Sequence, residues 1–237
     1  MEKIKVAVVG AGGYVGGALC AALKKKSGIA LTEVIRMNYD KMREGSYDIL
    51  INSAAPSKRF WAKNHPAEDF KETVQKTADL LYGWKYGKFI QISTVSARCE
   101  LHTVYGRHKA AAEKLCVSPQ NLIVRLSAMY SPALSKGALI DILAGRKVYV
   151  SGASRYAFTS VDFAGAWIAG HLDRMGVIEV GAKDALSLHE VAESLGKKIE
   201  FEGPVEVQEI QNPEPDFPDA REVFHYLDGM KNTKGLG

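Results

Sequence analysis

Short apolar runs alternate with longer amphipathic stretches along the first 130 residues of the chain. The apolar runs predict buried strands at residues 6–9, 29–36, 47–53, 88–93 and 121–126. Helical patterns lie between them at residues 14–26, 66–82 and 105–116, the second of which begins with Pro66. Because strands alternate with helices, we expect an α/β fold with a doubly wound parallel sheet and right-handed crossovers.

After about residue 130 the pattern loosens. Helices are expected at residues 135–144, 162–175, 187–195 and 220–230, the third opened by the capping box SLHE. Short strands are expected at residues 147–150, 177–180 and 198–202, and the proline-rich stretch at residues 211–220 is expected to be a loop. We interpret residues 1–237 as a single domain, with its core over about residues 1–132 and the elements of a small C-terminal substrate lobe over about residues 133–237.

A glycine-rich turn, GAGGYVG, follows the first predicted strand. Gly10 permits a sharp exit from the strand, and Gly13 lets backbone N–H groups approach a pyrophosphate. Gly16 lets the next helix lie close to the sheet. Since the turn joins a strand to a helix, we predict that it binds a dinucleotide; the alternative is a purely structural turn.

The end of the second predicted strand indicates which dinucleotide binds. An acidic side chain there accepts hydrogen bonds from ribose hydroxyls, whereas a basic one pairs with a 2′-phosphate. Arg36 holds this position, about 20 residues after Gly16. We therefore expect NADP slightly ahead of NAD; the alternative for Arg36 is an ordinary exposed cation at a strand end.

Tyr105 and Lys109 stand four residues apart on a predicted helix, and so lie on one face. A phenol ordinarily has a pKa near 10, and a neighbouring ammonium together with a positively charged nicotinamide should lower it. Tyr105 could then exchange a proton with a carbinol while Lys109 also holds the nicotinamide ribose. The hydroxyl-rich stretch ISTVSA precedes them at the carboxyl end of a predicted strand, the edge where open α/β sheets bind ligands.

The glycine turn, INSAAP, ISTVSA, the Tyr105/Lys109 pair and IVRLSAMYSP follow the order seen in the short-chain dehydrogenase/reductase superfamily. The chain resembles its extended branch, the NAD(P)-dependent sugar-nucleotide epimerases, dehydratases and reductases, over residues 4–132 and more weakly beyond. The resemblance implies a Rossmann-type fold and a Thr-Tyr-Lys site in which Thr94 orients the substrate, with Ser93 and Ser96 as rivals. The residues expected to contact the cofactor are Gly10, Gly12, Gly13, Tyr14, Val15, Gly16, Arg36, Ser53, Ala54, Ala55, Pro56, Ser93, Tyr105, Lys109, Arg125, Ser127 and Met129.

Two departures from the family concern the fold. The connection between Arg36 and Tyr47 is short, so a helix and a strand usual in the family are expected to be lost or shrunken. Thr73 stands where the family often has asparagine and Lys76 where it often has glycine. The sequence therefore does not predict the structural hydrogen bond that the family makes at these positions.

Two other departures concern the chemistry. Few residues separate Thr94 from Tyr105, so the loop that helps cover the substrate is short, which implies an open pocket or a small substrate. Val95 and Ser96 follow Thr94 where dehydratases of the branch have an Asp-Glu pair for water elimination. Dehydration is therefore disfavoured.

The expected function is that of an NAD(P)-dependent oxidoreductase or epimerase acting on a carbonyl or hydroxyl of a small or sugar-nucleotide substrate. Reduction or oxidation is preferred to epimerisation through a transient ketone. The alternative from another class is a catalytically silent NAD(P)-sensing binding protein on the same fold. A structural α/β domain without nucleotide is a third possibility.

Composition excludes several partners. The net charge of +4 is spread along the chain, so no nucleic acid is expected. Three cysteines without a C-x-x-C pair predict neither disulfide nor metal, and no apolar run has membrane-spanning length. We therefore expect a cytoplasmic protein that does not bind membranes, and a homodimer is left open. Surface or capping positions are expected for the histidines that lack ligand spacing: His65, His102, His108 and His189.

Overall fold

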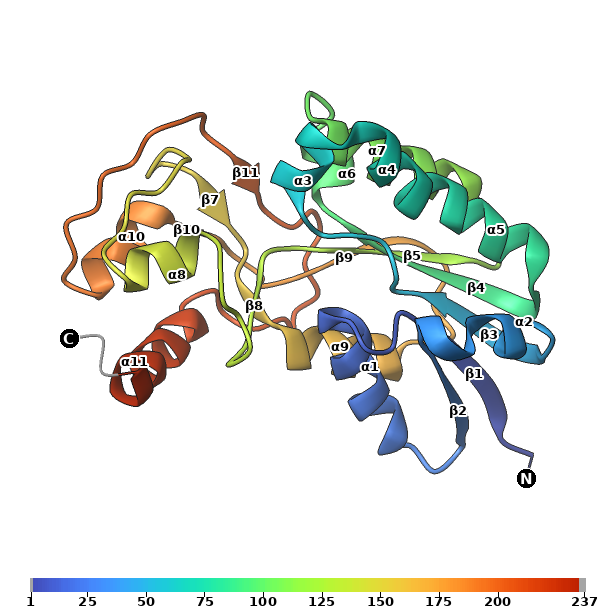
Figure 1. Cartoon of the computed structure of the whole chain (residues 1–237). Helices are drawn as coiled ribbons and strands as arrows, with labels where there is room; N and C mark the ends of the chain where they lie inside the picture. Colours follow the sequence, from blue (N-terminus) through green and yellow to red (C-terminus); the bar gives the residue numbers. More distant parts are fainter. Residues whose placement is uncertain (1, 235–237) are drawn as a thin grey trace. The chain divides into compact units, whose positions relative to one another are not determined.

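A computed structural model describes residues 2–234 of the chain (Figure 1). The chain forms two compact units. The first runs up to Leu126 and includes Asp162–Ile178; the second comprises Ser127–Val161 and the chain from Glu179 onward. The candidate site residues from Gly10 to Arg125 all belong to the first unit, and Ser127 and Met129 belong to the second.

A six-stranded sheet in the order β2-β1-β3-β4-β5-β9 forms the centre of the first unit. All pairings from β2 to β5 are parallel. The predicted strands are present, and their bounds are β1 Ile4–Val9, β2 Ile29–Val34, β3 Ser46–Asn52, β4 Lys85–Thr94, β5 Leu122–Leu126 and β9 Gly176–Val180. Their apolar runs are continuous because helices bury both faces of a parallel sheet.

Helices cover the two faces of this sheet (Figure 1). On one face lie α1 Tyr14–Lys24 and α9 Val161–Gly170, where Gly165 packs against the backbone of Ala18. The other face is covered by α4 Pro66–Phe70, η2 Lys71–Gln75, α5 Lys76–Gly83 and α7 Val104–Leu115. Residues 66–82 thus form one continuous helical stretch, as predicted, with a π-helical turn at η2. The Rossmann-type doubly wound arrangement is confirmed.

Four short helical elements lie in three connections of the first unit: η1 Arg36–Asn38, α2 Tyr39–Arg43, α3 Arg59–Asn64 and α6 Ser96–Cys99. Only η1 and α2 lie between β2 and β3, and β2 is an edge of the six-stranded sheet. The strand expected to be lost from the family's sheet is therefore missing from the described chain, because the connection between Arg36 and Tyr47 is too short to contain it.

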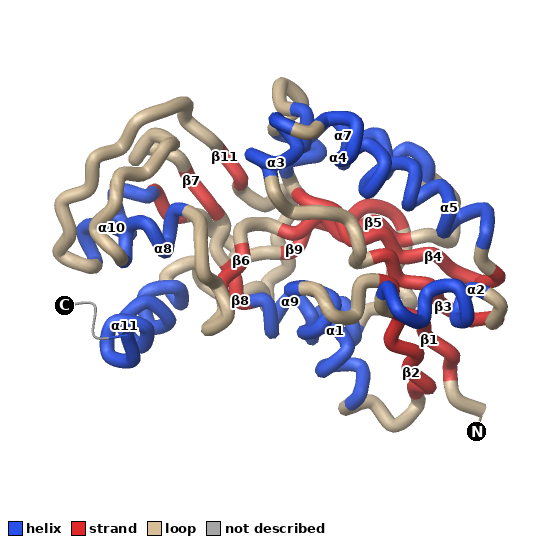
Figure 2. Tube along the Cα trace, viewed as in Figure 1, coloured by secondary structure: helices blue, strands red, loops and turns tan. Residues whose placement is uncertain are grey.

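The second unit packs around its own apolar cluster, which includes Leu139, Ile142, Leu188, Val191 and Leu227. Its helices are α8 Ala138–Leu143, α10 Leu188–Ser194 and α11 Glu222–Lys234. Its strands are two residues long: β6 Met129–Tyr130 pairs with β8 Thr159–Ser160, and β7 Arg155–Tyr156 lies between β10 Leu186–Ser187 and β11 Val207–Gln208. Much of the unit is loop (Figure 2).

Two details of the second unit test the sequence pattern. The capping box at α10 is present: Ser187 Oγ accepts a hydrogen bond from Glu190 N, and the Glu190 carboxylate accepts one from Ser187 N. The strands predicted at residues 147–150 and 198–202 are wrong, because only a single bridge joins Val148 to Phe201. Val148 is the one buried residue in these two stretches, so little side-chain packing extends the pairing.

Candidate functional site

The carboxyl ends of β1, β3 and β4 lie along one edge of the sheet, since these strands are parallel. The chain passes from β1 to β2 on one side and later returns to β3 on the other side of β1. Ligands of open α/β sheets bind where the strand order reverses in this way. The glycine turn follows β1, Ser53 follows β3, and Thr94 ends β4.

The glycine turn is packed too tightly for side chains at two positions. Gly10 has φ +87°, and a Cβ there would lie 2.7 Å from the backbone of Ala54. A Cβ on Gly16 would overlap the carbonyl oxygen of Gly10. Gly13, exposed at the N-cap of α1, leaves the helix without a side-chain cap, and the first turn carries no acidic residue. The first N–H groups and the positive end of the helix dipole are therefore suited to an anion such as a pyrophosphate.

The segment after β3 adjoins this turn. Ser53 N donates to Val9 O at 2.9 Å, and Ala54 N donates to the buried Asn52 Oδ1 at 3.1 Å. The Ser53 hydroxyl oxygen is buried and has no hydrogen-bond partner within the described residues. Ala54, Ala55 and Pro56 are partly exposed. An orphaned hydroxyl beside a glycine cradle fits a ligand with hydroxyl and phosphate groups, which is the chemistry of a dinucleotide.

Arg36 opens η1 two residues after the end of β2 and is exposed. Within the part of the chain that the structure describes, its guanidinium takes part in no ion pair. Glu33, which lies in β2 three residues before Arg36, forms an ion pair with Lys24 at 2.6 Å. The strand end therefore presents an uncompensated positive charge rather than a carboxylate.

The structure brings Thr94, Tyr105 and Lys109 together. Thr94 is half-buried at the last position of β4, and a side-chain hydrogen bond with Thr94 is among the influences that lower the pKa of Tyr105. Tyr105 and Lys109 lie on α7 and are only 6% and 4% exposed. Lys109 Nζ lies 5.3 Å from the centre of the Tyr105 ring. The spacing of four residues has thus placed both groups on one helix face.

The ionisation of this pair differs from the expectation. Burial raises the pKa of Tyr105 to about 12, although the charge of Arg59 and the hydrogen bond with Thr94 act to lower it. Burial also lowers the pKa of Lys109 to about 8, against the opposing charges of Asp69 and Glu113. In the chain by itself, desolvation of the phenol thus outweighs the neighbouring charges. The lowering expected from the Lys109 ammonium together with a positively charged nicotinamide stays a prediction.

A replacement of Lys109 by methionine is expected to stabilise the protein at pH 7. The folded-state pKa of about 8 lies below the ordinary 10.5, so the unfolded chain binds the additional proton between these pH values and burial of the charged form costs stability below pH 8. We expect Lys109→Met to raise the free energy of unfolding by about 3 kcal/mol at pH 7, with the gain fading as the pH rises to 10.5. Urea unfolding at a series of pH values measures this, and a gain independent of pH would contradict it.

The two rival hydroxyls have other partners. Ser93 Oγ donates to the buried Glu113 carboxylate at 2.6 Å. Ser96 is completely buried, and its Oγ lies 3.2 Å from Arg59 Nη2 and 3.3 Å from Thr94 Oγ1. Thr94 is thus the most exposed of the three residues.

Three residues assigned to the cofactor have structural contacts. Arg125 forms a bidentate ion pair with Glu113, with Nη2 at 2.7 Å from Oε2. In the second unit, Ser127 Oγ donates to the carbonyl oxygen of Ala157, and Met129 lies in β6, paired with Thr159 of β8. Their roles toward a cofactor stay predictions.

Sequence reasoning missed several charged groups around the Tyr105/Lys109 pair. Arg59 forms an ion pair with the buried Glu100 at 3.1 Å. Asp69 is completely buried, and its Oδ2 lies 2.7 Å from Nδ1 of His108, so the surface position expected for His108 is wrong. Asp69 is buried on the helix face that continues with Thr73 and Thr77, so no apolar spacing in the sequence marked it as buried.

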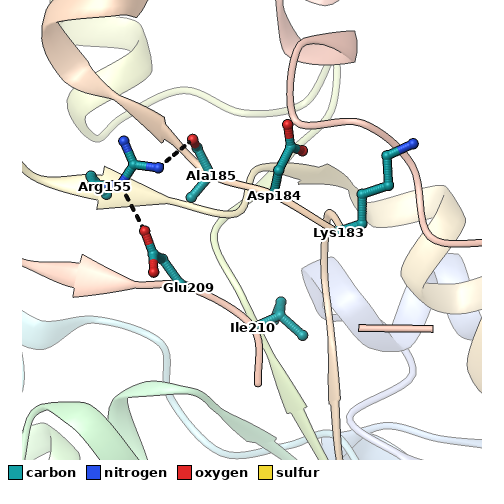
Figure 3. A pocket seen from close by; sticks show the side chains of 6 residues that line it. All are labelled: Arg155, Lys183, Asp184, Ala185, Glu209 and Ile210. Atoms are coloured by element: carbon teal, nitrogen blue, oxygen red, sulfur yellow. Dashed lines mark hydrogen bonds and ion pairs between the residues drawn. The ribbon is translucent and has the colours of Figure 1, made fainter. Parts of the chain in front are cut away.

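A pocket of about 200 Å³ lies in the second unit (Figure 3). The residues that line it are Arg155, Lys183, Asp184, Ala185, Glu209 and Ile210. Arg155 donates to Glu209 at 2.7 Å and to the Ala185 carbonyl oxygen at 3.0 Å, so much of its charge is already satisfied. The contacts among the residues that line this pocket therefore indicate no particular ligand.

Two further properties concern residues 2–234. No cluster of three or more His, Cys, Asp or Glu side chains in this range is arranged to hold a metal ion. None of the helices described there combines the length and the apolar character needed to cross a membrane.

No protein-family model matches the chain, and no curated protein matches it by sequence. Solved structures resemble it closely. A variant of UDP-glucuronic acid 4-epimerase from Bacillus cereus, in complex with UDP-4-deoxy-4-fluoro-glucuronic acid and NAD, is 19% identical with a TM-score of 0.74 over 96% of this chain and 100% of that chain. dTDP-4-dehydrorhamnose reductase from Bacillus anthracis str. Ames, in complex with NADP, is 17% identical with a TM-score of 0.72 over 97% and 99%.

A third similar structure is an NAD-dependent NDP-hexosamine 5,6-dehydratase involved in tunicamycin biosynthesis, 14% identical with a TM-score of 0.75 over 98% of this chain and 99% of that chain. The three proteins are named for three different reactions, so the fold alone does not select one. The chain therefore has the same Rossmann-type fold as these three proteins.

Proposed function

We propose that the protein is an NAD(P)-dependent oxidoreductase or epimerase that acts on a carbonyl or hydroxyl group of a small or sugar-nucleotide substrate. The observation that carries the proposal is the placement of Lys109 over the buried ring of Tyr105, with Thr94 at the end of β4, the sheet edge that also carries the glycine turn. A dinucleotide-sensing protein has no chemical need for such a group of side chains.

The residues that would hold the dinucleotide are the glycine turn and the start of α1 for the pyrophosphate, Ser53 and Lys109 for hydroxyl groups, and Arg36 for the adenosine end. When bound, a nicotinamide supplies the hydride acceptor or donor. Ala54, Ala55 and Pro56, which follow β3, are partly exposed and suited to line the same ligand.

Tyr105 acts as the acid or base. In the reductive direction its hydroxyl donates a proton to the substrate oxygen as that oxygen gains negative charge, and in the oxidative direction the phenolate accepts the proton of the carbinol. Thr94 orients the substrate oxygen through a hydrogen bond. Burial raises the pKa of Tyr105 to about 12 in the chain by itself, so its hydroxyl is protonated at neutral pH and is able to donate in the reductive direction.

Dehydration is not proposed. Val95 follows Thr94 and is completely buried, and Ser96 is committed to Arg59 and Thr94. Neither can serve as the carboxylic acid and base that water elimination needs.

Binding and turnover experiments test the proposal together. NADH or NADPH at a hundred times its Kd is expected to stabilise the protein by about 2.7 kcal/mol, which raises the Tm. Bound cofactor is then expected to change its redox state with at least one member of a panel of sugar nucleotides and small carbonyl compounds. Tight binding without redox change across the panel would favour a sensor, and no Tm shift with either dinucleotide would favour a structural domain.

Arg36 is expected to set the preference between the two dinucleotides. Arg36→Glu replaces a cation that pairs with a 2′-phosphate by a carboxylate that repels it, so the Kd for NADPH is expected to rise about tenfold or more while that for NADH changes little. Isothermal titration with both dinucleotides measures the change. Lys41→Glu, which reverses another exposed charge nearby on α2, is the control. Equal weakening by both variants would assign the effect to general electrostatics.

A further inference from the structure

A buried ion pair lies close to Thr94 and has no task in the mechanism above. Arg59, the first residue of α3, places Nη1 at 3.1 Å from Oε1 of Glu100. The Glu100 side chain is 4% exposed and that of Arg59 is 35% exposed. The carboxylate is thus almost wholly removed from water, and the guanidinium reaches in from the rim.

The second arm of Arg59 leads to the reaction site. Its Nη2 donates to Ser96 Oγ at 3.2 Å, and Ser96 Oγ in turn accepts from Thr94 Oγ1 at 3.3 Å. A continuous series of hydrogen bonds therefore runs from the guanidinium through the Ser96 hydroxyl to the Thr94 hydroxyl.

We propose that Arg59 is a positioning residue of the reaction site: held by Glu100 and bonded to Ser96, its guanidinium orders the Thr94 hydroxyl and supplies a fixed positive charge that acts on the Tyr105 phenol. This inference rests on the proposed function, because it gives Arg59 a task in the proton transfer of Tyr105. The residue comes from the connection after β3, which packs over the short stretch between Thr94 and Tyr105.

The electrostatics agree with this geometry. Among the groups that lower the pKa of Tyr105, the charge of Arg59 has the largest effect, ahead of the Thr94 hydrogen bond. Glu100 and Asp69 act in the opposite direction. Lys109, over the ring, has its own pKa lowered to about 8 and loses its charge above that pH. A guanidinium keeps its charge at every pH of interest, so Arg59 is the constant positive charge at this site.

A spectroscopic titration of the phenol tests the proposal without any need for turnover. The probe is 3,5-difluorotyrosine incorporated at position 105, whose phenol ionises at lower pH than tyrosine and whose ionisation is followed by ¹⁹F NMR. Arg59→Gln is expected to raise the midpoint by about one pH unit, since an opposite charge within a few ångströms lowers a pKa by about 1 to 3 units. Arg59→Lys, which keeps the charge, is expected to restore most of the difference.

A double variant guards against misfolding. Arg59→Gln alone leaves the Glu100 carboxylate buried without its cation, which destabilises a fold. Arg59→Gln combined with Glu100→Gln removes both charges. The midpoint is still expected to rise, though less, because the lowering effect of Arg59 exceeds the raising effect of Glu100. Arg107→Gln on α7, whose guanidinium bonds the carbonyl oxygens of Leu101 and His102, is the matched control and is expected to leave the midpoint unchanged.

The outcomes separate this inference from the proposed function. A midpoint that stays the same in Arg59→Gln and in the double variant overturns the role of Arg59, whether or not the wild type turns over a substrate. A wild type without redox activity overturns the proposed function, while the midpoints still report on Arg59. Where turnover is found, the pH at which alcohol oxidation rises is expected to shift upward in Arg59→Gln and to return in Arg59→Lys.

Discussion

Tyr105→Phe is expected to lower turnover about 10³-fold, within the 10² to 10⁴ that positioned acid–base groups contribute. The substitution removes the oxygen proposed to exchange a proton with the substrate and leaves a ring of the same shape in the buried site. The Kd for the dinucleotide is expected to stay within about threefold, because the glycine turn and Arg36 are untouched. Steady-state kinetics with the substrate found in the panel, together with titration of the cofactor, measure both quantities.

The control for this prediction is Tyr82→Phe, which removes a phenol oxygen from a side chain that is 78% exposed on α5. Its turnover and its cofactor affinity are expected to match the wild type. Turnover by Tyr105→Phe at the wild-type rate would remove Tyr105 from the mechanism. Loss of cofactor affinity with turnover retained at saturation would make it a binding residue instead.

Gly16→Ala is expected to destabilise the fold by about 1 to 3 kcal/mol and to weaken dinucleotide binding strongly. The added Cβ would overlap the Gly10 carbonyl oxygen, so either α1 moves away from the sheet or the turn opens. Both changes displace the backbone N–H groups at the start of the helix, which are the proposed pyrophosphate ligands. Urea unfolding and cofactor titration measure the two effects.

The neighbouring glycine is a matched control for this substitution. At Gly17 a Cβ would lie 3.7 Å from the nearest atom, the carbonyl oxygen of Ala11, which is an ordinary contact. Gly17→Ala is therefore expected to stabilise α1 by about 0.5 to 1 kcal/mol through helix propensity. If both alanine variants gained stability and bound the cofactor normally, close packing at Gly16 would not be what shapes the turn.

Local patterns predicted the framework of the first unit well. Continuous apolar runs marked the six strands, and the short connection after Arg36 foretold the missing strand, because neither feature depends on distant residues. The pattern failed at residues 147–150 and 198–202, where alternation alone could not reveal that only Val148 is buried. Strand formation there depends on partners from elsewhere in the chain.

For the candidate site too, some features follow from the local sequence and others from the tertiary structure. The sequence by itself determined the spacing of Gly10 and Gly16, the shared helix face of Tyr105 and Lys109, and the place of Thr94 at a strand end, since each follows from local backbone geometry. Only the tertiary structure decided which charges surround them. Arg59 reaches Ser96 across 37 residues and Asp69 reaches His108 across 39, and burial raised the pKa of Tyr105 while lowering that of Lys109. Desolvation and long-range pairing depend on how the elements pack, which no local pattern encodes.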